Sequence, residues 1–240
     1  MTHVGDLVAE LLVGYGVTHV FGQPGGQTAA LYDGLARRPS SIRHTLVRDE
    51  RSAAYAADAF ARLTGHPGVC DVTVGPGTTK LTDGLVESHN ASVPVVALVG
   101  ELPRDWAPYR AMGVASQGFD QLTLLSAITK AALWVPSVAS LPQMVRTAFR
   151  VATTGRSGPV ALIVPHDVLD ADWQPNEADL RSTIVTAAPR PTVPRPPRTA
   201  SSRPQPSWRR PADPSWSRVE ACTHRGPPPS WPRWPNGSTR

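Results

Sequence analysis

Glu50 is the residue of this 240-residue chain whose position is best suited to chemistry. It follows an expected strand, residues 42–47, and opens an expected alanine-rich helix that Asp49 can cap and Gly65 can end. Ligands of open α/β sheets collect at the carboxyl ends of the strands, where this carboxylate would lie. Acids are also common in first helical turns because they complement the helix dipole, so position alone leaves a structural role open.

Two glycine-rich loops also follow expected strands, at residues 22–26 and 75–77. Loops of this kind let the backbone approach a ligand closely. Neither has the glycine spacing of a dinucleotide-binding or phosphate-binding loop, and no nucleophile-elbow sequence is present. The seven histidines have no metal-type spacing, so we expect no metal site.

The elements that must position these residues alternate between strands and helices. Apolar runs predict six strands, and periods near 3.6 predict helices between them. Such alternation favours parallel pairing with right-handed crossovers. We therefore expect an α/β fold for residues 1–170, a three-layer sandwich around a roughly six-stranded parallel sheet. The expected strands are 18–21, 42–47, 69–74, 94–99, 131–135 and 160–164, and the main helices are 4–15, 28–36, 50–64, 80–88 and 141–153.

The composition changes after a linker at residues 171–188. Residues 189–240 hold 14 of the 26 prolines and ten arginines, but no Leu, Ile, Phe, Met or Tyr. Their net charge is +8, which leaves −3 for residues 1–188. A segment of this composition buries too little apolar area to offset its ordering entropy, so we expect a disordered tail. Three interpretations stay open: an out-of-frame sequence, part of a split subunit, or, as the weakest, a binding module. The Arg and Trp residues of such a module could contact nucleic acid, or its Pro runs could occupy an aromatic groove.

Several spaced motifs, in order, give the chain a family resemblance. Residues 1–170 resemble the N-terminal, pyrimidine-binding domain of thiamine-diphosphate enzymes of the acetolactate synthase and benzoylformate decarboxylase group. The motifs that carry the resemblance are VFGQPGG (20–26), RDE (48–50) opening AAYAADAFARLTG (53–65), GPGTT (75–79), SVP (92–94), ITK (128–130) and GPV (158–160).

The resemblance implies a role for each candidate residue. The glutamate that matches Glu50 hydrogen-bonds N1′ of the cofactor's aminopyrimidine and promotes the tautomer that removes the thiazolium C2 proton. The activated cofactor then attacks a 2-keto acid. By the same comparison Gly25, Gly26, Pro76 and Gly77 line the cofactor, and Gln117 faces the substrate.

This sequence also departs from the family pattern. Lys80 stands where the family usually has asparagine, and Ser116-Gln117-Gly118 matches only the glutamine of the Phe-Gln-Glu motif of acetolactate synthases. A decarboxylase or another carboligase is therefore as well supported as an acetolactate synthase.

The family's diphosphate-binding motif, Gly-Asp-Gly, does not occur in this sequence. Mg²⁺ is expected only through a missing or separate domain, because a diphosphate needs a metal and its oxygen ligands. We expect a homodimer or a separate diphosphate-binding subunit, and a chain that is inactive alone. The alternative is a non-catalytic remnant or a binding adaptor with a basic tail. No apolar run reaches membrane-spanning length and no signal peptide is evident, so the expected location is cytoplasmic.

Overall fold

The structure is a computed structural model that describes residues 3–173. Its centre is a six-stranded sheet in the order β2-β1-β3-β4-β6-β5, and every pair of neighbours is parallel. The expected parallel sheet is therefore confirmed. The expected tail, and the linker beyond residue 173, lie outside the described residues. The strands are β1 (His19–Gly22), β2 (Arg43–Leu46), β3 (Gly68–Val72), β4 (Val95–Glu101), β5 (Ala131–Trp134) and β6 (Val160–Pro165).

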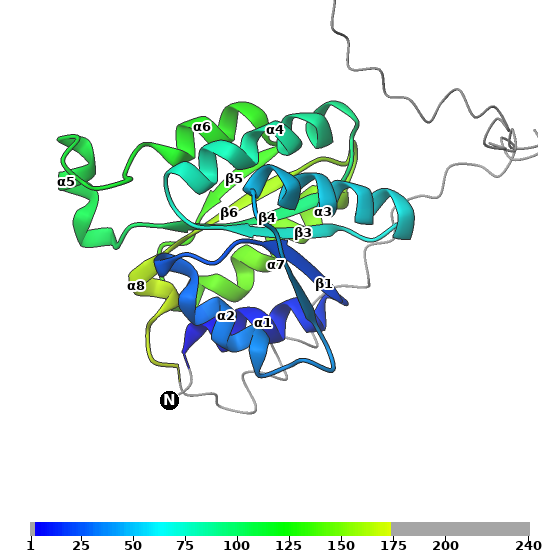
Figure 1. Ribbon diagram of the computed structural model, residues 1–240, viewed down its shortest axis with the longest axis horizontal. Helices are drawn as coiled ribbons and strands as arrows, with labels where there is room; N and C mark the ends of the chain where they lie inside the picture. Colours follow the sequence, from blue (N-terminus) through cyan, green and yellow to red (C-terminus); the bar gives the residue numbers. More distant parts are fainter. Residues whose placement is uncertain (1–2, 174–240) are drawn as a thin grey trace, which may run out of the picture. The chain divides into compact units, whose positions relative to one another are not determined.

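Helices cover both faces of the sheet (Figure 1), which confirms the expected three layers. One face packs against α1, α2 and α7, and the other packs against α3, α4 and α6. Strands β3, β4 and β6 are buried along their whole length because both of their faces are covered. The helices are α1 (Val4–Gly14), α2 (Ala29–Ala36), α3 (Glu50–Thr64), α4 (Pro76–Asn90), α5 (Ala107–Ala111), α6 (Gln121–Ile128), α7 (Leu141–Thr153) and α8 (His166–Leu169), with 3₁₀ turns at Gly26–Thr28, Arg104–Trp106 and Val138–Ser140.

The direction of chain progression across the sheet reverses at β1. From β1 the chain passes through α2 to β2 at the sheet edge, and then crosses through α3 to β3 on the other side of β1. The loops that leave β1 and β3 therefore start side by side, with Phe21 opposite Cys70 and Gly22 opposite Asp71. A reversal of this kind opens a crevice at the carboxyl edge of the sheet, which is the usual ligand position in such folds.

The alanine-rich helix α3 forms as the sequence predicts. Asp49 is extended and its side chain accepts a hydrogen bond from the Arg51 backbone N–H, which satisfies one of the free donors of the first turn. Gly65 ends the helix with φ of 72°, a left-handed conformation that glycine adopts without strain. Four of the buried residues of α3 are alanines, Ala53, Ala54, Ala57 and Ala61, and these small side chains let α4 approach closely.

Helices α3 and α4 approach each other closely at Gly84. A Cβ atom on Gly84 would lie 2.5 Å from Ala54 Cβ and 2.9 Å from the Tyr55 backbone nitrogen. We expect Gly84→Val to push the helices apart and lower the free energy of unfolding by about 2–3 kcal/mol, the usual cost of overpacking. Urea denaturation measures this loss. Ala59→Val, on the exposed face of α3, is the control and should cost less than about 1 kcal/mol. Equal losses would contradict close packing at Gly84.

Three local expectations were wrong. A loop was expected at residues 75–77 and a helix from Lys80, but α4 already begins at Pro76, because proline suits a first helical position. Strand β2 was expected to be an apolar strand, yet it is a largely exposed edge strand and the Leu46 side chain is 64% exposed. Helices α5, α6 and α8 were not predicted. None of the helices within residues 3–173 is long and apolar enough to cross a membrane.

Candidate functional site

Glu50 is the first residue of α3, just beyond the carboxyl end of β2. Its side chain is only 8% exposed, although a carboxylate in a first helical turn is normally solvated. No hydrogen bond reaches Glu50 Oε2, and an unsatisfied buried carboxylate oxygen is costly unless something pairs with it. The Lys80 ammonium lies 3.2 Å from this oxygen as an ion pair. The buried carboxylate is therefore balanced by the charge of Lys80, and its Oε2 accepts no hydrogen bond.

Thr73, which leaves β3, connects the two glycine loops. A Cβ atom on Gly25 would lie 2.3 Å from Thr73 Cβ, and one on Gly77 would lie 3.3 Å from Thr73 Cγ2. The Thr73 hydroxyl donates a hydrogen bond of 2.8 Å to Gln27 Oε1. The same position on Gly77 is 3.5 Å from Glu50 Oε1. The structure therefore brings Gly25, Gly77 and Glu50 together around Thr73, a residue that the sequence reasoning missed.

The remaining expected site residues are Pro76, Gly26 and Gln117. Pro76 precedes Gly77 at the start of α4 and is exposed. Gly26 is exposed and has open space where a Cβ atom would project, so nothing in the structure ties it to Glu50. Gln117 lies over Gly75, where a Cβ atom would be 2.6 Å from the Gln117 carbonyl oxygen. Gln117 is exposed and has φ of 61°, a strained conformation that is concentrated at functional sites.

Gln121 holds these loops in place and was not identified from the sequence. It is fully buried at the start of α6. Its Oε1 accepts hydrogen bonds from the Gly75 backbone N–H at 3.3 Å and from the Thr78 hydroxyl. Its Nε2 donates to the Gly100 carbonyl at 3.1 Å and to Glu101 Oε2 at 2.9 Å. One amide side chain thus joins the start of α4 to the end of β4. Its sequence neighbours, Asp120 and Leu122, do not indicate that this glutamine is buried.

Asp49, the residue before α3, forms an ion pair with Arg51. Both oxygens of Asp49 accept hydrogen bonds from the Arg51 guanidinium, at 2.9 and 2.8 Å. These bonds hold the pKa of the Asp49 carboxyl well below its usual range. Arg51 thus pairs with Asp49, while Lys80 pairs with Glu50.

The described residues fit one part of a thiamine cofactor. Glu50 offers a buried oxygen without a hydrogen bond, and its other oxygen faces the Gly77 backbone at the start of α4. Among residues 3–173, no group of three or more His, Cys, Asp or Glu side chains could hold a metal ion. The Glu50 site fits the aminopyrimidine end of the cofactor.

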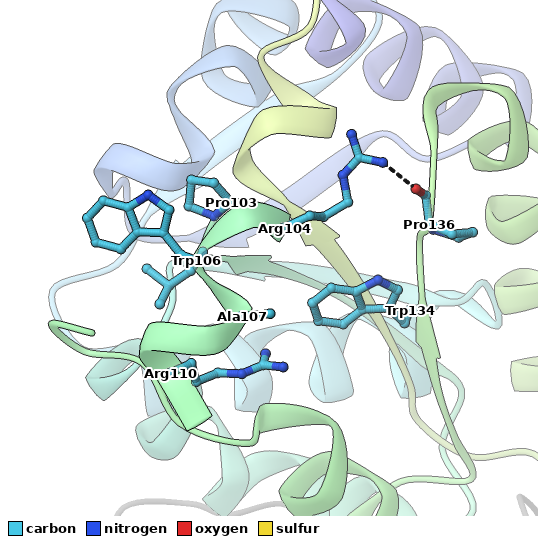
Figure 2. A pocket seen from close by; sticks show the side chains of 8 residues that line it. Pro103, Arg104, Trp106, Ala107, Arg110, Trp134 and Pro136 are labelled. Carbon is cyan, nitrogen blue, oxygen red and sulfur yellow. Dashed lines mark hydrogen bonds between the residues drawn. The ribbon is translucent and has the colours of Figure 1, made fainter. Parts of the chain in front are cut away.

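A separate hollow of about 270 Å³ lies where β4 and β5 end (Figure 2). Arg104 and Arg110 line it, but Arg104 pairs with Asp167 and donates to the Pro136 carbonyl, and Arg110 pairs with Glu101 and lies over the Trp134 ring. None of the expected site residues lines it, and both guanidiniums already have carboxylate partners. The lining residues are Leu102, Pro103, Arg104, Trp106, Ala107, Arg110, Trp134 and Pro136.

The fold defines a class: an open, doubly wound α/β domain in which Glu50 and the loops after β1 and β3 lie at the carboxyl edge of the sheet, beside the reversal of strand order. Residues 2–124 match the family described as thiamine pyrophosphate enzyme, N-terminal TPP binding domain. The chain belongs to this family, and the resemblance read from its motifs is confirmed. Thiamine pyrophosphate and thiamine diphosphate are the same compound.

Acetolactate synthases are among the similar proteins. The chain is 42% identical over 168 residues to the acetolactate synthase of Arthrospira platensis, which covers 68% of this chain and 28% of that protein. It is 42% identical over 164 residues to the chloroplastic acetolactate synthase 2 of Nicotiana tabacum, covering 68% and 24%. It is 40% identical over 167 residues to a probable acetolactate synthase large subunit of Methanocaldococcus jannaschii, covering 70% and 27%. The chain spans about a quarter of the length of these relatives.

Proposed function

We propose that residues 3–173 bind the aminopyrimidine end of thiamine diphosphate, with Glu50 as the partner of its ring nitrogen N1′. The observation that carries the proposal is the buried Glu50 oxygen without a hydrogen bond, at the carboxyl edge beside Gly77. The enzyme class is one that acts on 2-keto acids, as a decarboxylase or carboligase, and family membership supports this class. The cofactor, when bound, supplies the carbon nucleophile and the electron sink.

The chain's own residues orient the ring and handle a proton. Glu50 Oε2 would exchange a hydrogen-bonded proton with N1′, and burial of the carboxylate excludes the water that would compete for it. Gly25, Gly77 and Pro76 would form the wall along the ring, and Gly26 would extend it. Gln117, on the loop above Gly75, would face the substrate. Gln121 would keep that loop and the start of α4 at a constant separation.

The rest of the site would come from another protein surface. Mg²⁺ and the diphosphate need oxygen ligands, and we propose that a second copy of the domain or a separate diphosphate-binding subunit brings them. The acetolactate synthase relatives are about four times as long as the matched segment, which is consistent with ligands outside it. On this basis the described domain supplies one half of a cofactor site.

Backbone-amide NMR tests where the cofactor binds. We expect thiamine diphosphate with Mg²⁺, added to the full chain at millimolar concentration, to shift the amide signals of Gly25, Glu50 and Gly77. The reason is that ring binding changes the surroundings of these amides. The internal control is the hollow at the opposite edge, lined by His19, Phe60 and His66, whose signals should stay unmoved. Shifts confined to that opposite edge would contradict the proposal.

A further inference from the structure

The ion pair between Lys80 and Glu50 joins two helices across the proposed ring site. Glu50 is the first residue of α3 and Lys80 is the fifth residue of α4, one turn beyond Gly77. Lys80 Nζ lies 3.2 Å from Glu50 Oε2. No hydrogen bond of normal geometry accompanies this contact, so it is held by charge. The Lys80 side chain is 48% exposed, which gives the ammonium an open route into solvent.

The ammonium lies at Glu50 Oε2, the oxygen that the proposed function assigns to the ring nitrogen. The other oxygen, Oε1, faces Gly77, where a Cβ atom would lie 3.5 Å away. Oε2 is the oxygen without a hydrogen bond. A ring nitrogen that approaches Glu50 at Oε2 therefore meets the position of Lys80 Nζ.

We propose that Lys80 is a resident counter-ion that competes with the aminopyrimidine ring for Glu50. The proposal rests on the proposed function, because it assigns the regulation of the same site. An ammonium offers three donors and no acceptor, so it binds the carboxylate without exchanging a proton in the way that N1′ would. Ring binding must displace it, and the long, half-exposed side chain can move away into water. Lys80 thus lowers the affinity of this half-site for the aminopyrimidine ring. A whole cofactor whose diphosphate end is bound by another protein surface would still displace the ammonium.

The neutral fragment 4-amino-5-hydroxymethyl-2-methylpyrimidine is the probe that isolates this competition. It lacks the thiazolium and the diphosphate, so Lys80 acts on it only through Glu50. NMR titration of the full chain at millimolar fragment gives the dissociation constant. We expect Lys80→Met to bind the fragment about two- to fivefold more tightly than the wild type, the range expected for loss of one exposed ion pair. Lys80→Arg keeps the charge and should bind like the wild type.

Two further comparisons separate the possible failures. In a Glu50→Gln background the Lys80→Met gain should disappear, and added salt should tighten binding to the wild type but not to Lys80→Met. If Glu50→Gln weakens binding while Lys80→Met changes nothing, Lys80 does not compete and the proposed function survives. If Glu50→Gln has no effect, or no protein binds the fragment, the proposed function fails and this proposal fails with it.

A direct readout of the ion pair uses the lysine content of the chain, since Lys80 and Lys130 are its only lysines. Reductive methylation with ¹³C gives one signal for each and keeps their charge. We expect Glu50→Gln to shift the Lys80 signal and to leave the Lys130 signal in place, because Lys130 Nζ donates to the Val151 and Thr154 carbonyls. An unmoved Lys80 signal would show that the ion pair does not form in solution and would overturn the proposal.

Discussion

Glu50→Gln is expected to lower turnover by about 10²- to 10⁴-fold, the range for loss of a positioned acid–base group. Glutamine has nearly the same shape but cannot give or take a proton, so the fold and the ring contacts should survive. A chimera provides the assay, with residues 1–173 of this chain in place of the aligned segment of the Arthrospira platensis acetolactate synthase. Formation of acetolactate measures turnover, and hydrogen–deuterium exchange at C2 of bound thiamine diphosphate measures the proton-transfer step.

Glu87→Gln is the matched control for this experiment. Glu87 is on α4, its side chain is 53% exposed, and its contact with Arg62 is 3.4 Å long. The same chemical change there should leave both rates unaltered. Thermal unfolding of each chimera separates a catalytic loss from a folding defect. If Glu50→Gln retained turnover within a factor of about three, the free-energy difference would be under 1 kcal/mol and the proposed role would be wrong.

The largest expected effect on stability is at Asp6, far from the proposed site. Its side chain is only 1% exposed and pairs with Arg37 Nη1 at 2.5 Å and with Arg38 Nη1 at 2.9 Å. The His3 backbone N–H donates to it as well. Asp6→Asn removes the charge and leaves two guanidiniums beside a neutral amide. We expect a loss of about 3 kcal/mol, at the lower end for a broken buried pair because Arg37 can turn to water.

Urea denaturation measures this loss, with Asp33→Asn as the control. Asp33 is an exposed acid on α2, so the same change in charge there should alter the free energy of unfolding by less than about 0.5 kcal/mol. Equal effects of the two variants would mean that the Asp6 ion pairs do not stabilise the junction of α1 and α2.

The pH dependence of stability provides a second test of the Asp6 prediction. Burial alone would raise the pKa of the Asp6 carboxyl, but the hydrogen bonds from Arg38, Arg37 and His3 lower it on balance, below the ordinary value of 3.8. A carboxyl whose pKa falls on folding adds stability above the unfolded-state pKa, and this stability is lost as the pH falls through the folded-state value. The stability difference between wild type and Asp6→Asn should therefore shrink below about pH 4.

The pKa of another buried carboxyl, that of Asp71, shifts in the opposite direction from the pKa of Asp6. Burial raises the pKa of Asp71, although His44 and Tyr32 hydrogen-bond to it. Stability from a raised pKa is present at low pH and is lost as the pH rises. Asp71 is the same in wild type and in Asp6→Asn, so its contribution cancels in their difference. A difference that stayed constant through acid pH would contradict the lowered Asp6 pKa.

The sequence alone was sufficient for features that depend on neighbouring residues. The cap at Asp49, the left-handed stop at Gly65 and the apolar strand β4 were predicted because each depends on hydrogen bonds or periodicity within a few residues. Strand–helix alternation then favoured parallel pairing. Parallel neighbours need a crossover connection that carries the chain back to the end of the sheet where the previous strand began, and a helix between two strands provides it. The position of Glu50 beyond a strand, and its place within a family motif, followed from the same local pattern.

Only the tertiary structure decided which of these local features meet. β1 pairs with β3 as well as with β2, the next strand in the sequence. This arrangement places Gly25 against Thr73 and Gly77 against Glu50. The contact of Lys80 with Glu50 joins residues that are 30 positions apart, and Gln121 reaches back to Gly75 across 46 positions. Such contacts depend on crossover connections and on helix packing distances, which no local pattern encodes. The buried Glu50 and its counter-ion are therefore properties of the fold.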